Sequence, residues 1–120
     1  MIERKTAEND AALRVLFLCA RNRRRSPTVE ALFAGRPGLE VASAGLAPDA
    51  EEVVTPDLLD WSQLIFVMEP AHRAKLRRQF GAHLRHARVV CLDIPDRYAF
   101  MDAALVALLE ARVGVHLRRG

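Results

Sequence analysis

Four short apolar runs alternate with segments that have helical features, and this alternation limits the chain to a few folds. The runs cover residues 14–18, 39–43, 63–68 and 88–92, and each has the length of one strand. Helices are predicted over 27–34, from 55–57 onward, over 70–80 and over about 100–113. Strands that alternate with helices pair in parallel through right-handed crossovers. The run at 63–68 is apolar throughout, which is typical of a strand covered on both faces.

The length of 120 residues suits one hydrophobic core and is too short for two. We therefore expect a single three-layer α/β/α domain with a four-stranded parallel sheet in the flavodoxin-like order 2-1-3-4. Residues 13–120 are predicted to form this domain. Residues 1–12 are predicted to form a polar N-terminal tail or a short helix.

The composition argues against several classes of protein. No apolar run approaches the ~20 residues of a membrane span, and the N-terminus lacks the apolar stretch of a signal peptide. Two cysteines are too few for a disulfide scaffold, so a cytoplasmic location without a membrane partner is predicted. The net charge of +3 comes mostly from scattered arginines, and aromatic residues are few, which argues against a nucleic-acid partner. The four histidines show no metal-ligand spacing beyond His83-x-x-His86, and that pair is expected at the surface.

The segment that follows the first predicted strand carries the chemistry. Cys19 ends the strand, Arg25 stands six residues later, and Ser26-Pro27 has the pattern of a helix start. In doubly wound sheets, ligands bind beyond the carboxyl ends of the strands. Loop N–H groups, a helix N-terminus and a bidentate arginine together can hold a phosphate dianion. The same positive field favours a cysteine thiolate, so Cys19 is predicted to be a nucleophile.

The pattern Cys19-x-x-Asn22-x-x-Arg25-Ser26-Pro27, followed by Glu30, resembles the signature of the low-molecular-weight protein tyrosine phosphatases. Residues 41–45 (Val-Ala-Ser-Ala-Gly) and 64–69 continue the likeness, which is closest to a short branch described as predicted tyrosine phosphatases. The resemblance implies that Cys19 attacks phosphorus and that Arg25 binds the phosphate and stabilises the transition state. It also implies that Ser26 assists the thiolate as leaving group, while Asn22 and Ser43 brace the loop. The residues expected to bind phosphate are Ala20, Arg21, Asn22, Arg23, Arg24, Arg25 and Ser26.

The family uses an aspartate after the last strand as general acid, and two candidates stand there. Asp96 is favoured, because Tyr98 two residues later would place an aromatic ring beside the phosphoryl group. Asp93 is the alternative, and one of the two is expected only to form a turn. The acid would protonate the leaving oxygen and later activate water, a contribution of ~10²–10⁴ in rate.

The chain departs from the family pattern at Arg21, where glycine is common, and at Arg24, where a second cysteine is frequent. The expected function is a cysteine-dependent, tyrosine-phosphatase-like hydrolase that forms a phosphocysteine. It would act on a phosphorylated protein or a small aryl phosphate, without metal or cofactor, as a monomer or weak homodimer. One alternative is a phosphate- or phosphoprotein-binding module that does not turn over. Another is a thiol-dependent arsenate reductase, which needs further cysteines where this chain has only Cys91, itself predicted to be a core residue.

Overall fold

The computed structural model describes residues 12–20, 25–95 and 97–117, with the side chains of all of these except Arg25 and Ser26. The strands are β1 (Leu13–Cys19), β2 (Leu39–Gly45), β3 (Leu64–Val67) and β4 (Arg88–Cys91). The helices are α2 (Arg25–Phe33), α3 (Pro56–Trp61), α4 (Pro70–Phe80), the 3₁₀ helix η1 (Gly81–Leu84) and α5 (Ala103–Leu117). The tail or helix predicted over 1–12 lies outside the described residues apart from Ala12.

The four strands form one parallel sheet in the order β2-β1-β3-β4, which confirms the predicted order 2-1-3-4. Leu18 on β1 pairs with Ala44 on β2 and with Val67 on β3, and Val67 pairs in turn with Cys91 on β4. All four residues of β3 are buried, as its continuous apolar sequence predicted. The crossovers bring the carboxyl ends of the four strands to one end of the molecule.

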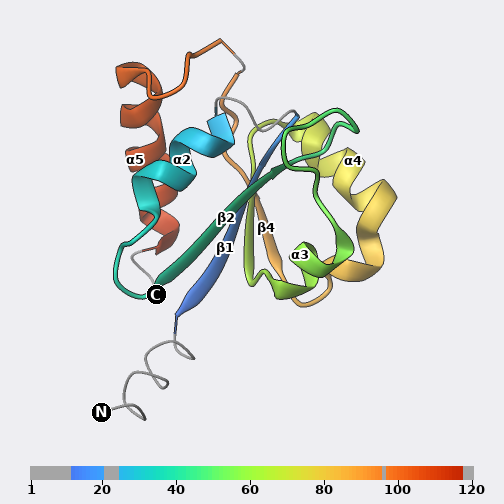
Figure 1. Cartoon of the computed structure of the whole chain (residues 1–120). Helices are drawn as coiled ribbons and strands as arrows, with labels where there is room; N and C mark the ends of the chain where they lie inside the picture. Colours follow the sequence, from blue (N-terminus) through green and yellow to red (C-terminus); the bar gives the residue numbers. More distant parts are fainter. Residues whose placement is uncertain (1–11, 21–24, 96, 118–120) are drawn as a thin grey trace, which may run out of the picture.

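The helices cover both faces of the sheet and complete three layers, with α2 and α5 on one side and α3 and α4 on the other (Figure 1). Between the sheet and the α2/α5 layer, the ring of Phe17 stacks on those of Phe33 and Phe66, with ring centres 6.2 and 5.2 Å apart. On the opposite face, Leu16 and Leu18 belong to a second core with residues of α3 and α4. The expected three-layer α/β/α fold is therefore confirmed.

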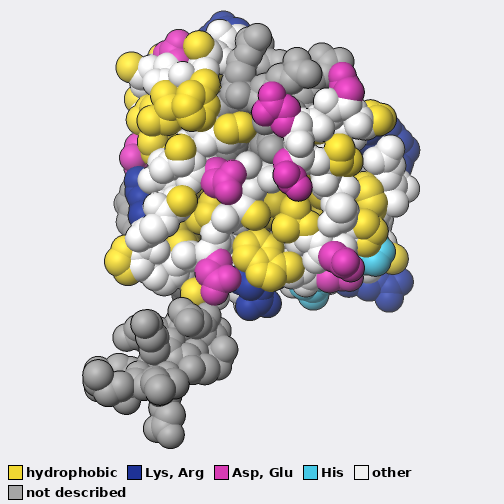
Figure 2. All heavy atoms as spheres, in the orientation of Figure 1, with side chains coloured by type: hydrophobic (Ala, Val, Ile, Leu, Met, Phe, Trp, Pro, Cys, Tyr) yellow, Lys and Arg dark blue, Asp and Glu magenta, His cyan; other side chains and the backbone are white. Residues whose placement is uncertain are grey.

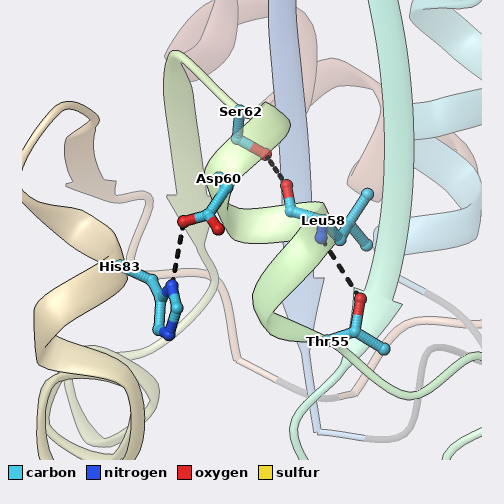
Figure 3. A network of polar contacts seen from close by, with 5 residues as sticks. All are labelled: Thr55, Leu58, Asp60, Ser62 and His83. Atoms are coloured by element: carbon cyan, nitrogen blue, oxygen red, sulfur yellow. Dashed lines mark hydrogen bonds and ion pairs between the residues drawn. The ribbon is translucent and has the colours of Figure 1, made fainter.

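A small polar network fixes α3 against η1 (Figure 3). The Thr55 hydroxyl accepts a hydrogen bond from the Leu58 N–H and caps the start of α3, the helix predicted from residues 55–57 onward. At the other end, the Ser62 hydroxyl donates to the Leu58 carbonyl. The Asp60 carboxylate lies 2.9 Å from Nδ1 of His83, and this contact joins α3 to η1.

Helix boundaries differ from the predicted ones where local geometry sets them. Helix α2 begins at Arg25 rather than at Pro27, and the proline remains in the first turn, where its missing N–H has no cost. Helix α5 begins at Ala103 rather than near 100, because the Asp102 carboxylate accepts from the Ala104 N–H at 2.8 Å. Gly81 ends α4 but has φ −50°, so the chain continues directly into η1.

Two further observations concern the sequence predictions. Of the pair expected at the surface, His86 is exposed and His83 is half-buried, whereas His72 on α4 is buried. Within residues 12–20, 25–95 and 97–117, no helix is long and apolar enough to cross a membrane.

Candidate functional site

Cys19 is the last residue of β1 and lies at the carboxyl end of a central strand. Its side chain is 3% exposed and belongs to the core on the α2/α5 side, together with Phe17 and Val29. Alternation along the strand explains this orientation, because Val15, Phe17 and Cys19 point to one face and Leu16 and Leu18 to the other. The thiol therefore lies on the face of the sheet that α2 covers, and α2 begins six residues later at Arg25.

The backbone that leaves β1 is tied to the segment that leaves β2. The Cys19 carbonyl accepts from the Leu46 N–H at 3.0 Å, and the Ala20 carbonyl accepts from the Ala47 N–H at 2.8 Å. These bonds extend the β1–β2 pairing past the end of the strands and hold the first residue of the predicted phosphate loop. The position at which the loop begins is thus fixed by β2.

Several predicted site residues lie outside the part of the chain that the structure describes. These are Arg21, Asn22, Arg23 and Arg24 of the predicted loop, together with Asp96, the favoured general acid. For Arg25 and Ser26 the structure describes the backbone, which forms the first two residues of α2. Ala20 is half-buried and directly follows β1.

Helix α2 is held to the sheet by a polar contact between Ser43 and Glu30. The Ser43 hydroxyl on β2 donates to the Glu30 carboxylate in the middle of α2. Ser43 is buried and pairs with Phe17 across the sheet, two residues before Cys19. Ser43 was predicted to brace the phosphate loop, and its described contact acts on the helix that follows that loop. Glu30 stood within the sequence pattern, but nothing in the pattern assigned it this partner.

The segment between β4 and α5 contains the second acid candidate and Tyr98. Asp93 is exposed and has φ +59°, a left-handed conformation that aspartate tolerates better than most residues. It lies between the buried residues Leu92 and Ile94, whose N–H groups donate to the carbonyls of Val67 and Met68 at 2.8 and 2.7 Å, so the left-handed residue interrupts a pairing with β3 that continues past β4. Tyr98 is half-buried against the core that contains Cys19, with the Arg97 guanidinium 5.5 Å from the centre of its ring. The structure thus brings Tyr98 to the Cys19 side of the sheet.

Two side chains that the sequence analysis missed hold this segment at both ends. Nη1 of Arg112 on α5 donates to the carbonyls of Leu92 and Asp93, at 2.9 and 2.8 Å. The Thr28 hydroxyl on α2 accepts from the Met101 N–H at 2.9 Å. Neither contact has a sequence signal, because each joins residues from separate elements that approach only in the folded chain.

The two cysteines of the chain lie on opposite faces of the sheet. Cys91 packs against the core on the α3/α4 side, whereas Cys19 belongs to the other core. Cys91 is level with Leu18 and two strands away from it, a separation of about 9–10 Å at the usual strand spacing. A disulfide requires Cα atoms within about 7 Å and side chains that approach each other. The fold therefore excludes a disulfide between Cys19 and Cys91 without rearrangement.

Other features of the described residues lie away from Cys19. A pocket of about 300 Å³ lies between α4, η1 and β4, on the α3/α4 side, and its lining includes Arg77, Arg85 and Val89. Among the described residues, no group of three or more His, Cys, Asp or Glu side chains could hold a metal ion.

The fold is similar to those of several solved structures, although the sequence alone finds no match. No protein-family model matches the chain, and no curated protein matches it in sequence. Solved structures do match: the YwlE arginine phosphatase from Geobacillus stearothermophilus has a TM-score of 0.72 at 23% identity, covering 89% of this chain and 94% of that chain. Wzb from Vibrio vulnificus, solved with benzylphosphonate, has a TM-score of 0.69 at 21% identity, covering 90% and 99%. The fold is that of the low-molecular-weight protein tyrosine phosphatases.

This result confirms the resemblance predicted from the loop pattern, at the level of the fold. An arsenate reductase, the thioredoxin-dependent Cg_ArsC1' from Corynebacterium glutamicum, shares the same fold with a TM-score of 0.63 at 18% identity, covering 96% of this chain and 65% of that chain. Because phosphatases and a reductase share one architecture, the fold alone does not select the reaction. The choice depends on the residues of this chain.

Proposed function

We propose that the chain is a cysteine-dependent phosphatase in which Cys19 is the nucleophile. The observation that carries the proposal is the position of Cys19 at the carboxyl end of a central strand, directly before the loop that leads into α2. The N-terminus of α2, which follows, attracts a phosphate dianion to this place. The Cys-x5-Arg spacing adds Arg25 as the bidentate ligand of the phosphoryl group.

The reaction would proceed in two displacements at phosphorus. The Cys19 thiolate forms an S–P bond while the P–O bond to the leaving group breaks, and a general acid protonates the departing oxygen. Water then attacks the phosphocysteine, the S–P bond breaks, and inorganic phosphate leaves. One neighbour gives support: a YwlE variant in which the active-site cysteine is replaced by serine carries a phosphorylated serine, with a TM-score of 0.57 at 26% identity.

We assign the general acid to Asp96. Asp93 has a left-handed backbone conformation just after β4, and Arg112 binds its carbonyl, which favours a conformational role for that aspartate. The spacing of Asp96 to Tyr98 supports the assignment, since Tyr98 packs on the core that contains Cys19.

Phosphotyrosine or another aryl phosphate is the proposed substrate class. The structural neighbours include arginine phosphatases, so phosphoarginine is the natural competitor. Phosphoarginine carries a guanidinium beside its phosphoryl group, whereas this chain has Arg21, Arg23, Arg24 and Arg25 in and next to the loop. Like charges in a partly desolvated site repel, so the loop composition favours an uncharged aryl leaving group.

The structure also bears on the arsenate reductase alternative. Such chemistry needs a second thiol to relieve the nucleophilic cysteine by disulfide formation. Cys91 is the only other cysteine of the chain, and it lies on the opposite face of the sheet. This geometry favours hydrolysis over a thiol relay.

The test is hydrolysis of p-nitrophenyl phosphate by the native chain, Cys19→Ser and the matched control Cys91→Ser. We expect turnover by the native chain and Cys91→Ser, and its loss in Cys19→Ser. Rapid quenching should trap phosphate on Cys19 in the native chain. Phosphotyrosine and phosphoarginine peptides of one sequence then test the substrate class. No turnover by a folded, reduced chain, with phosphopeptide binding retained, would instead support the binding module.

A further inference from the structure

Two neighbouring large apolar side chains, Phe100 and Met101, are exposed in the segment before α5. Phe100 is 54% exposed and Met101 44% exposed, whereas the other large apolar residues exposed among those described, Val53 and Val115, stand singly. In Figure 2 hydrophobic side chains gather at the upper left, over the first turns of α5 and the segment that precedes it. Single exposed apolar residues are ordinary, but an adjacent pair on a connecting segment marks a contact surface more often.

The backbone fixes this pair in the exposed position. Met101 has φ +61°, a conformation that a methionine adopts only when its surroundings impose it. Its N–H donates to the Thr28 hydroxyl on α2, and the Asp102 N–H closes the turn on the Ala99 carbonyl at 3.1 Å. Asp102 in turn accepts from the Ala104 N–H and caps α5. The turn is thus held by two helices while its apolar side chains face solvent.

The turn lies beside the proposed phosphoryl site. Thr28 is the fourth residue of α2, so the Met101 N–H is bound about 4.5 Å along the helix axis from Arg25, at 1.5 Å per residue. Val29, the next residue of α2, packs in the same core as Cys19. In Figure 1 the segment before α5 passes over the end of the molecule to which β1 points. A substrate bound at Cys19 would therefore extend next to this turn.

We propose that Phe100 and Met101 form an apolar docking surface for a phosphoprotein substrate, which receives a hydrophobic side chain close in sequence to the phosphorylated residue. The occupant is the substrate chain because the surface adjoins the start of the helix that follows Cys19. The inference rests on the proposed phosphatase function and extends it to substrate choice. Small aryl phosphates lack the neighbouring side chain that the surface would receive, so peptide and protein substrates should depend on it most.

The test compares the native chain with Phe100→Ala/Met101→Ala and with Val115→Ala, a control that shortens an exposed apolar residue on α5, away from the turn. The substrates are p-nitrophenyl phosphate and two phosphotyrosine peptides of equal charge, one with leucine residues and one with serine residues flanking the phosphotyrosine. We expect the double variant to lose roughly tenfold in kcat/KM on the leucine peptide, as burial of a side chain of this size predicts. Activity on p-nitrophenyl phosphate and on the serine peptide should stay within twofold, and Val115→Ala should match the native chain.

Three outcomes would overturn the docking surface. An equal decrease in kcat/KM of the double variant on all three substrates would mean that the turn supports the active site and does not bind the peptide. An unchanged preference for leucine over serine would remove the pair from substrate recognition. A concentration-dependent dimer of the native chain that the double variant abolishes, with no change in peptide preference, would make a second copy the occupant.

Failure of the phosphatase proposal has a separate signature. A native chain that hydrolyses no phosphate ester at all defeats the catalytic proposal. The docking surface is then tested by peptide binding to Cys19→Ser, with and without the Phe100→Ala/Met101→Ala changes. A preference for the leucine peptide that the changes abolish would keep the surface as part of a binding module, and equal affinities would reject it.

Discussion

The Ser43 hydroxyl on β2 donates a hydrogen bond to the Glu30 carboxylate on α2, so the helix that follows the candidate phosphate loop is joined to the strand beside Cys19. Parallel pairing fixes Ser43 relative to Phe17 and therefore relative to Cys19. Through the hydrogen bond to Glu30, the position of Ser43 also constrains the position of α2. Helix α2 is thus held to the strand beside β1 by a polar pair, in addition to its packing in the core.

Removing this pair should lower stability and activity together. Because the bond is partly buried and involves a carboxylate, Ser43→Ala should reduce the free energy of unfolding by about 1–2 kcal/mol. Glu30→Gln keeps a hydrogen-bond acceptor, so it should reduce the free energy of unfolding by less than Ser43→Ala does. A double-mutant cycle with Ser43→Ala and Glu30→Ala, measured by urea unfolding, should give a coupling energy of ~1 kcal/mol. A coupling energy near zero would contradict a structural role for the contact.

Asp93 and Asp96 should differ sharply when each carboxylate is removed. Asp96→Asn should lower kcat by ~10²–10³ and abolish the fall of kcat at high pH, since a general acid acts only when protonated. Asp93→Asn should stay within about threefold of the native rate, because asparagine also tolerates a left-handed turn. The pH profile of kcat for both variants measures this difference. The reverse ranking would assign the acid to Asp93.

The left-handed backbone conformation of Asp93 also gives a stability prediction. Asp93→Gly should leave the free energy of unfolding nearly unchanged, because glycine adopts φ +59° without steric cost. Asp93→Val should destabilise by about 1–2 kcal/mol, since a β-branched side chain disfavours that conformation. Thermal unfolding of the two variants measures the difference. Equal melting temperatures would mean that the turn relaxes on substitution.

Arg112 should act as a positioning residue for the acid-bearing segment. Arg112→Met removes the donor to the Leu92 and Asp93 carbonyls, so the segment is held less firmly where it leaves β4. The decrease in kcat should be larger for phenyl phosphate than for p-nitrophenyl phosphate, because the poorer leaving group depends more on protonation by the general acid. Arg36→Met, which removes the exposed ion pair with Glu110, is the matched control. It should leave kcat on both esters close to the native value. An equal loss on both esters would indicate a structural role only.

Oxidation should inactivate the protein without joining its two cysteines. The sheet separates Cys19 from Cys91, so mild treatment with hydrogen peroxide should give Cys19 oxidation without an intramolecular disulfide. Hydrogen peroxide should inactivate Cys91→Ser at a rate within about twofold of that for the native chain. Mass spectrometry after peptide cleavage under non-reducing conditions detects the linked peptides if they form. Their formation in the folded chain would contradict the assigned faces.

Local pattern was enough to predict the sheet and the place of Cys19. Short apolar runs separated by helical segments specify parallel strands, and the position of Cys19 after such a run places it at the carboxyl end of β1. The four strands and the order 2-1-3-4 agree with the structure. The start of α2 at Arg25 and of α5 at Ala103 did not follow from pattern, because capping contacts and turn geometry decide where a helix begins.

Tertiary structure alone decided the contacts that organise the site. Glu30 meets Ser43, Thr28 meets Met101, and Arg112 meets Asp93, and each pair joins elements that are distant along the chain. The separation of Cys19 from Cys91 likewise depends on strand register and on which face each strand presents. The sequence by itself determined the nucleophile candidate and the layers around it, since these follow from apolar periodicity and residue spacing. Side-chain partners follow from packing, because only the closed fold brings donors within reach of their acceptors.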